Sequence, residues 1–220
     1  MKRKWKLWMI AFVVFVMTDI MMQSNRAEAK KRTFTVSSKT IPCSSSYRQK
    51  PYYNKKTKQY YMINSYMRRL STTGGTLKLK KGTYKIPGTI YVPSNVKIVC
   101  ANGVKIKKTK ATGTKKVKST KFLFQMISEE KASGKQNTGK YAASKNASIQ
   151  GNGKVIFDMG NVNGATAVFV GHASGITVSG VRFRNKKGGS YIWIEGSKNI
   201  SVRQCVFERK KDVSGLKNRM

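Results

Sequence analysis

Two stretches of the chain, residues 164–186 and 188–210, repeat one pattern of apolar and polar positions 24 residues apart. When one stretch is laid on the other, apolar residues match apolar residues wherever a strand would point inward. The matched pairs are Val168/Ile192, Phe169/Trp193, Val170/Ile194, Ile176/Ile200, Val178/Val202, Val181/Cys205 and Phe183/Phe207. A repeat of this length is typical of folds that stack one supersecondary unit on the next.

Short strands are predicted along most of the chain after Gly75. Apolar and polar residues alternate with period two, and Gly, Pro and Asn separate the runs. The predicted strands cover residues 76–80, 83–86, 89–92, 96–99, 147–149 and 155–158. Aligning Ala147 with Ile176 and then with Ile200 gives steps of 29 and 24 residues. Coils of this length predict an all-β parallel β-helix, in which like side chains stack from coil to coil.

Turn residues recur at one position of these coils. Asn95, Asn146 and Asn199 each stand just before the matching strand, and Gly175 occupies the same position in its coil. Asn and Gly tolerate left-handed backbone conformations. The shared offset favours a ladder of stacked turn residues over turns that are merely alike in composition.

A short amphipathic helix is predicted at residues 57–70, where Tyr60, Ile63, Met67 and Leu70 recur at helical spacing. Residues 71–75 contain two glycines that end it. The preceding segment, 30–56, is basic and turn-rich and has no periodic signal. Two polar insertions, 105–121 and 128–145, are expected to form surface loops.

Residues 1–29 have the features of a secretory signal peptide. A basic stretch precedes an apolar run at 7–17, and Ala27-Glu28-Ala29 is a small-x-small cleavage pattern. The competing interpretation is a membrane anchor, but 11 apolar residues fall well short of the roughly 20 that cross a bilayer. We therefore expect a secreted or cell-surface protein without a transmembrane anchor after cleavage. Its parts are the signal peptide (1–29), a basic segment (30–56) and the β-helix with its helix (57–220).

The chain is strongly basic, with 45 Lys and Arg residues against 8 acidic residues and a net charge of +37. Such a chain attracts polyanions, which outside a cell are acidic polysaccharides, teichoic-type polymers, anionic membranes and stray nucleic acid. The alternative is a solvated basic surface without a specific partner. Cys43, Cys100 and Cys205 allow at most one intrachain disulfide, and Cys205 matches an inward valine, as expected of a core thiol. No Cys or His cluster indicates a zinc site.

Three stretches resemble the pectin-lyase-like, right-handed parallel β-helix superfamily, which includes pectate lyases and polygalacturonases. The helix followed by residues 74–84 is similar to the part in which a helix caps the open end of the β-helix. Residues 149–158 (IQGNGKVIFD) are similar to the I-x-G-x-G-x-I-D coil, and residues 197–207 (SKNISVRQCVF) to the Asn–apolar coil that ends in Cys-x-Phe. The resemblance implies this right-handed fold with a capping helix, and a pectate lyase-like or polygalacturonase-like activity on pectin-like uronans.

The acidic residues do not form the family's hydrolytic pattern. Hydrolysis needs carboxylates converging on one glycosidic bond, and the chain has neither Asp-Asp nor Gly-His-Gly. The candidates that remain for acid–base chemistry are His172, Asp158 and Glu195. His172 matches Gly196 in the next coil, so a turn residue is the alternative interpretation. No acidic cluster indicates a calcium site, so no cofactor is evident unless downstream residues supply calcium ligands.

Arg182, Arg184 and Arg203 alternate with inward residues and are expected to point outward, where arginines bind carboxylates in bidentate fashion. A solvated basic face is the alternative. Tyr191, beside Gly188-Gly189-Ser190, is preferred over Phe169 and Trp193 as a sugar contact, with core packing as the alternative.

The repeat stops near Arg209, and no amphipathic segment follows that could cover the last of about five coils. Since exposed ladder edges invite further pairing, we expect a β-helix that is incomplete at the C-terminus, with any active site further downstream. Two hypotheses remain: a secreted enzyme acting on acidic polysaccharide, or a cationic protein that binds anionic glycans without cleaving them. In both the protein is expected to be a monomer without a specific nucleic-acid partner.

Overall fold

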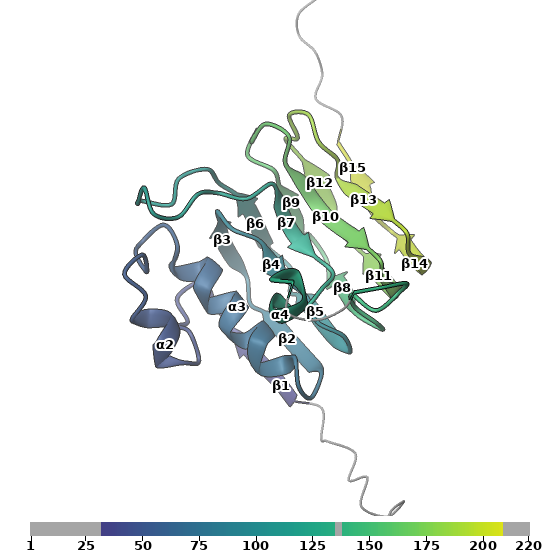
Figure 1. The fold of residues 1–220 in the computed structure, drawn as a ribbon. Helices are drawn as coiled ribbons and strands as arrows, with labels where there is room; N and C mark the ends of the chain where they lie inside the picture. Colours follow the sequence, from purple (N-terminus) through teal and green to yellow (C-terminus); the bar gives the residue numbers. More distant parts are fainter. Residues whose placement is uncertain (1–31, 135–137, 209–220) are drawn as a thin grey trace, which may run out of the picture. The chain divides into compact units, whose positions relative to one another are not determined.

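The computed structural model describes residues 32–134 and 138–208, and within them the chain forms three parallel sheets (Figure 1). The predicted signal peptide and the residues after 208 lie outside the described part. Sheet A has the order β1 (Arg32–Val36), β2 (Gly75–Leu79), β5 (Val96–Cys100), β8 (Ser148–Gly151), β11 (Ser174–Ser179) and β14 (Lys198–Arg203). Sheet B has the order β3 (Gly82–Ile86), β6 (Val104–Lys108), β9 (Ile156–Asp158), β12 (Arg182–Arg184) and β15 (Val206–Phe207). Sheet C has the order β4 (Ile90–Tyr91), β7 (Phe122–Gln125), β10 (Thr166–Gly171) and β13 (Ile192–Glu195).

From β2 onward the chain visits sheets A, B and C in turn, and each strand pairs in parallel with the strand one coil earlier. Crossovers between parallel strands are right-handed because of the twist of the strands. The predicted right-handed parallel β-helix is therefore confirmed.

The 24-residue repeat aligns residues as the sequence pattern predicted. Val168 pairs with Ile192, Ile176 with Ile200, and Phe183 with Phe207. One matched pair, Phe169 and Trp193, does not point inward as predicted. Both lie between inward residues of their strands and face out from sheet C.

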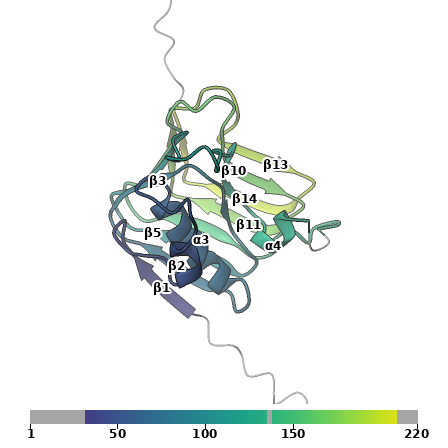
Figure 2. The ribbon, with the colours of Figure 1, turned by 60° about the vertical axis from the view of Figure 1, so that its left-hand side comes forward.

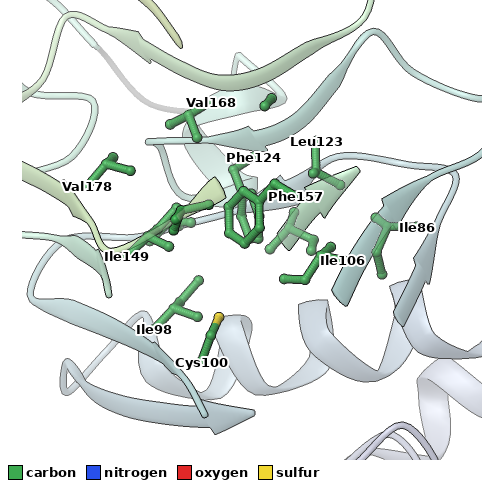
Figure 3. Packing of buried hydrophobic residues seen from close by; sticks show 14 of the residues in the cluster. Ile86, Ile98, Cys100, Ile106, Leu123, Phe124, Ile149, Phe157, Val168 and Val178 are labelled. Atoms are coloured by element: carbon green, nitrogen blue, oxygen red, sulfur yellow. The ribbon is translucent and has the colours of Figure 1, made fainter. Parts of the chain in front are cut away.

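The core consists of rows of buried side chains that run from coil to coil (Figure 3). One row in sheet A contains Leu77, Ile98, Ile149 and Val178, each fully buried. Phe124 and Phe157 stack at the centre with ring centroids 5.2 Å apart. Each such side chain contributes about 1.5–3 kcal/mol through burial, so the stacking of coils supplies the stability that no single coil could reach.

A helix covers the first coil of the β-helix, as predicted. Helix α3 (Lys58–Leu70) packs against β2, β3 and β4, and Figure 2 shows it beside β2. It buries Met62, Ile63, Met67 and Leu70. Asn64 in this helix donates to the Thr89 carbonyl and accepts from the Tyr91 N–H. These bonds satisfy backbone groups of β4, so the helix closes this end of the solenoid.

The predicted turn ladder is present between sheets C and A. Asn95, Asn146 and Asn199 have φ values of 60°, 53° and 55°, and Gly74 and Gly175 at the same position have 66° and 65°. All five backbones are left-handed, which Asn and Gly adopt at the least cost.

A buried lysine holds the loop after β6. Lys108 is 0 % exposed, and its Nζ donates to the carbonyls of Pro87, Gly88 and Phe122 at 3.0, 3.0 and 2.7 Å. It also donates to the Thr120 hydroxyl. Burial lowers the pKa of Lys108 to about 7, while the four acceptors favour its ammonium form. The lysine thereby ties residues 87–88 to residues 120–122.

The sequence pattern did not predict three strands, β1, β6 and β7, and two short helices. Residues 104–108 form β6. The sequence predicts a loop from residue 105 on because of its many lysines, although Val104-Lys105-Ile106-Lys107 alternates as a strand does. Residues 32–36, within a segment judged aperiodic, form the edge strand β1. The short helices are α2 (Ser45–Arg48) and α4 (Glu129–Ala132).

The last described coil leaves apolar side chains in solvent. Ile194, Val202 and Phe207 are 47 %, 39 % and 49 % exposed, although their counterparts one coil earlier are buried. The inward thiol of Cys205 is half-buried for the same reason, Cys100 is fully buried, and all three cysteines are free. Within residues 32–134 and 138–208, no helix is long and apolar enough to cross a membrane.

Candidate functional site

A groove of about 670 Å³ opens where sheet A passes into sheet B. Gly151, Gly153 and Gly180 line its corner, where backbones of successive coils approach closely. A Cβ atom at Gly151 would lie 2.2 Å from the Gly180 carbonyl oxygen, so only glycine fits. The charged side chains that line the groove are Lys154, Arg182, Arg184 and Glu208.

The groove continues onto a basic outer face of sheet B. Strand register places Lys105, Ile156, Arg182 and Val206 in one outward row. The neighbouring row contains Lys85, Lys107, Asp158 and Arg184, and Glu208 follows Arg184 one coil later. Cations therefore outnumber carboxylates on this face.

Asp158 is the centre of the charge network. Its Oδ2 lies 2.9 Å from Lys105 Nζ and 3.5 Å from Arg184 Nη2. Its Oδ1 accepts from the Asn185 amide at 2.9 Å and from the Gly160 N–H at 3.0 Å. The hydrogen bonds from Asn185, Lys105 and Gly160 outweigh burial and lower the pKa of Asp158 to about 2. Asp158 is therefore an ionised anchor for the cations around it.

The two arginines of the groove are held in place but remain accessible. Arg182 Nη1 lies 2.9 Å from Glu208 Oε1, and the side chain of Arg182 is 48 % exposed. The side chain of Arg184 is 31 % exposed. A guanidinium has five N–H donors, so one ion pair leaves donors for a further anion.

Asp158 lies on a different sheet from the other two acid–base candidates, whereas the backbones of His172 and Glu195 are neighbours, with the His172 N–H donating to the Glu195 carbonyl at 3.0 Å. Asp158 ends β9 in sheet B, Glu195 ends β13 in sheet C, and His172 stands in the turn after β10. His172 has a φ of 50°, its Nδ1 lies 3.3 Å from the Lys140 carbonyl, and its ring packs over Gly196. These contacts place His172 in the turn position that its match with Gly196 indicated.

A second carboxylate does share a face with Asp158. Glu208 occupies the same outward position two coils later, which corresponds to roughly 10 Å of strand spacing. Glycosidases require one of two such carboxyls to carry a proton. The lowered pKa of Asp158 excludes it as that proton donor, and Glu208 lies 2.9 Å from Arg182 Nη1.

The predicted substrate-binding residues occupy three different places. Arg182 and Arg184 point outward from sheet B, as predicted. Arg203 ends β14 in sheet A, so the expected arginine row is split between two sheets. Tyr191 is only 8 % exposed and packs between Phe183 and Phe207. Its hydroxyl donates to the Glu208 carbonyl at 2.6 Å, which leaves little of Tyr191 for a ligand.

Sequence reasoning missed Lys105 and Glu208 as members of this site. Lys105 lies in a segment for which the sequence predicts a loop. The residue one period before Glu208 is Arg184, which has the opposite charge, so the repeat gives no sign of an acidic position. The alternation around Lys105 could have placed it on a strand. The pairing of Glu208 with Arg182 depends on coil geometry and has no local signal.

Among the described residues, no group of three or more His, Cys, Asp and Glu side chains gathers in a way that could hold a metal ion.

No protein-family model matches the sequence, and no curated protein matches it. Among solved structures, the fold is similar to PfbA, a surface adhesin of Streptococcus pneumoniae, with a TM-score of 0.48 and 16 % identity. The match covers 68 % of this chain and 34 % of that one, so the chain spans about a third of the length of that structure.

Proposed function

We propose that this protein is a secreted or surface-bound member of the pectin-lyase-like superfamily that binds acidic polysaccharide without cleaving it. The observation that carries the proposal is the groove beside sheet B, in which Lys154, Arg182 and Arg184 face a channel open to solvent. The outward cations of sheet B run from coil to coil, so an extended chain lying across the coils would meet them in turn. The motifs at 74–84, 149–158 and 197–207 support the family assignment.

Recognition in this groove is electrostatic and bidentate. Arginine forks match the planar carboxylate of a uronate. The fixed carboxylates of Asp158 and Glu208 orient the arginines before a ligand arrives, which lowers the entropy that binding must overcome. The chain's net charge of +37 adds long-range attraction for any polyanion.

A binding role is favoured over catalysis by the state of the carboxylates. Elimination or hydrolysis needs a proton acceptor or donor in reach of the sugar. Asp158 is saturated with hydrogen bonds and ion pairs, and His172 and Glu195 lie on other parts of the solenoid. The enzyme hypothesis requires catalytic groups other than these.

Incubation with polygalacturonate tests the proposal. We expect neither unsaturated product absorbance nor new reducing ends, together with salt-sensitive retention of the protein on a pectate column. Formation of either product by the wild type would select the enzyme hypothesis. Passage through the column at low salt would reject both hypotheses for this substrate class.

A further inference from the structure

Three aromatic rings form a cluster on the outer face of sheet C, away from the basic groove. Phe122 and Phe169 stack with their centroids 4.7 Å apart and their planes 12° from parallel. Trp193 meets Phe169 at 5.2 Å and Phe122 at 6.3 Å, in both cases edge to face. These mutual contacts fix the rings relative to one another.

The strand pattern shows that the cluster faces outward. Val168 and Val170, on either side of Phe169, are both fully buried, so Phe169 points away from the core. Trp193 pairs with Phe169 one coil later and is 47 % exposed. On the other side of Phe169, the same outward row continues to Gln125 and then Tyr91.

The cluster is costly as a mere surface feature. A tryptophan side chain that is half exposed loses a burial free energy of about 25 cal/mol for each Å² of apolar surface in water. The same apolar side chains would be more favourable at inward positions, where the core would bury them. A Cβ atom at Gly171, two residues after Phe169, would lie 2.7 Å from the Phe169 ring. The glycine therefore leaves room for that ring.

We propose that Phe122, Phe169 and Trp193 form a stacking platform that binds the apolar face of a pyranose ring, independently of the charges of the groove. The C–H groups on one face of a pyranose meet the negative face of an aromatic ring favourably. Gln125, in the same row, carries donors and an acceptor for sugar hydroxyls. This surface goes beyond the anionic-glycan site because it needs no charge on the sugar.

A second copy of the chain is a poorer occupant. A stable dimer buries about 800 Å² per partner, which exceeds what three partly exposed rings offer. The net charge of +37 also makes two copies repel each other. A sugar ring, by contrast, needs only one ring face.

Tryptophan fluorescence tests the platform selectively. The chain has three tryptophans, Trp5, Trp8 and Trp193, so Trp193 is the only one in a full chain carrying Trp5→Phe and Trp8→Phe. This protein is titrated in high salt with neutral oligosaccharides: cellohexaose, xylohexaose, mannohexaose and chitohexaose in its N-acetylated form. We expect a saturable change in Trp193 emission with at least one of them.

Variants separate stacking from folding. Phe169→Ala should weaken the binding about fivefold to tenfold. Phe169→Leu keeps an apolar side chain if the alanine variant is unstable, and it should also weaken the binding because it lacks a flat ring. Tyr141→Ala, which removes a 39 % exposed aromatic ring outside the cluster, is the matched control and should leave the affinity unchanged. Far-ultraviolet circular dichroism confirms that each variant is folded.

Three results would overturn the platform: no response to any of the four sugars, a response that Phe169→Leu leaves intact, or an emission change that depends on protein concentration without sugar. The last result would indicate self-association. Because Phe169 lies outside the groove, retention on pectate should not change in these variants, so failure of the platform and failure of the polyanion site are distinguishable.

Discussion

Lys105 Nζ lies 2.9 Å from Asp158 Oδ2, diagonally across neighbouring strands of sheet B. The same carboxylate holds Arg184 from the following coil. A buried carboxylate thus binds cations of the coils before and after its own, and it couples the stability of the solenoid to the arrangement of the groove.

Replacing Asp158 with asparagine should reveal this coupling through pH. The pKa of Asp158 is lowered from 3.8 to about 2 in the folded protein, so the carboxylate stabilises the fold fully above the unfolded value. This contribution is lost as pH falls through about 2. Near neutral pH we expect Asp158→Asn to lower the free energy of unfolding by on the order of 2 kcal/mol.

Urea denaturation of both proteins between about pH 6 and pH 2 measures the effect. The gap between the proteins should close as pH falls. Glu195→Gln, at an exposed carboxylate, should show a much smaller gap. A gap for Asp158→Asn that stays constant down to pH 2 would show that the carboxylate charge is not the cause.

Lys108 provides a prediction on internal hydrogen bonding. Lys108→Met keeps the apolar stem but leaves the carbonyls of Pro87, Gly88 and Phe122 without this donor. Loss of these bonds should lower the free energy of unfolding by about 2–4 kcal/mol. Lys107→Met, on the outer face of the same strand, should change it by less than about 0.5 kcal/mol. Equal effects in chemical denaturation would mean that the buried ammonium contributes no net stability.

The turn ladder predicts different effects for two small substitutions at Asn146. Asn and Gly adopt its left-handed φ of 53° more readily than Ala does, so Asn146→Ala should cost about 1 kcal/mol. Asn146→Gly should be nearly neutral, as Gly175 occupies the same position one coil later. If thermal denaturation showed Asn146→Ala to be as stable as Asn146→Gly or more stable, the ladder would not result from the backbone conformation.

The cysteines should differ in reactivity. Cys100 is fully buried, and burial raises the pKa of its thiol to about 12, so an alkylating reagent at about pH 8 should spare it in the folded protein. Cys43 and Cys205 are half-buried and should react first. Mass spectrometry of the alkylated protein identifies the sites. Modification of Cys100 at the rate of Cys205 would indicate that the core opens readily.

Much of the fold could be predicted because its signals are local or periodic. The match of Val168 with Ile192 reports the coil length, and the apolar stripe of residues 60–70 reports the capping helix. The sequence does not predict strand β6 because six lysines among residues 105–116 favour a loop. The high lysine content of that segment favours a loop, whereas its alternation of apolar and polar residues allows Val104 and Ile106 to pack into the core.

The site was harder to predict because its members meet only through coil geometry. Arg182 and Arg184 were found from alternation alone. The sequence marks Asp158 as a candidate for acid–base chemistry, and nothing local shows that Lys105 and Arg184 neutralise it. The sequence favours Tyr191 over Phe169 as a sugar contact, with core packing as the alternative. In the structure Tyr191 is buried, because the corner between sheets B and C turns it inward, and Phe169 faces outward.

Titration with polygalacturonate at several salt concentrations tests the central claim most directly, with the wild type, Arg182→Gln/Arg184→Gln and Arg203→Gln compared. If sheet B carries the polyanion groove, the double variant should bind at least about tenfold more weakly and with a shallower dependence on salt. Arg203→Gln, on sheet A, should stay close to the wild type. Equal losses in the double variant and Arg203→Gln would show that general positive charge, and not the groove, binds the polysaccharide.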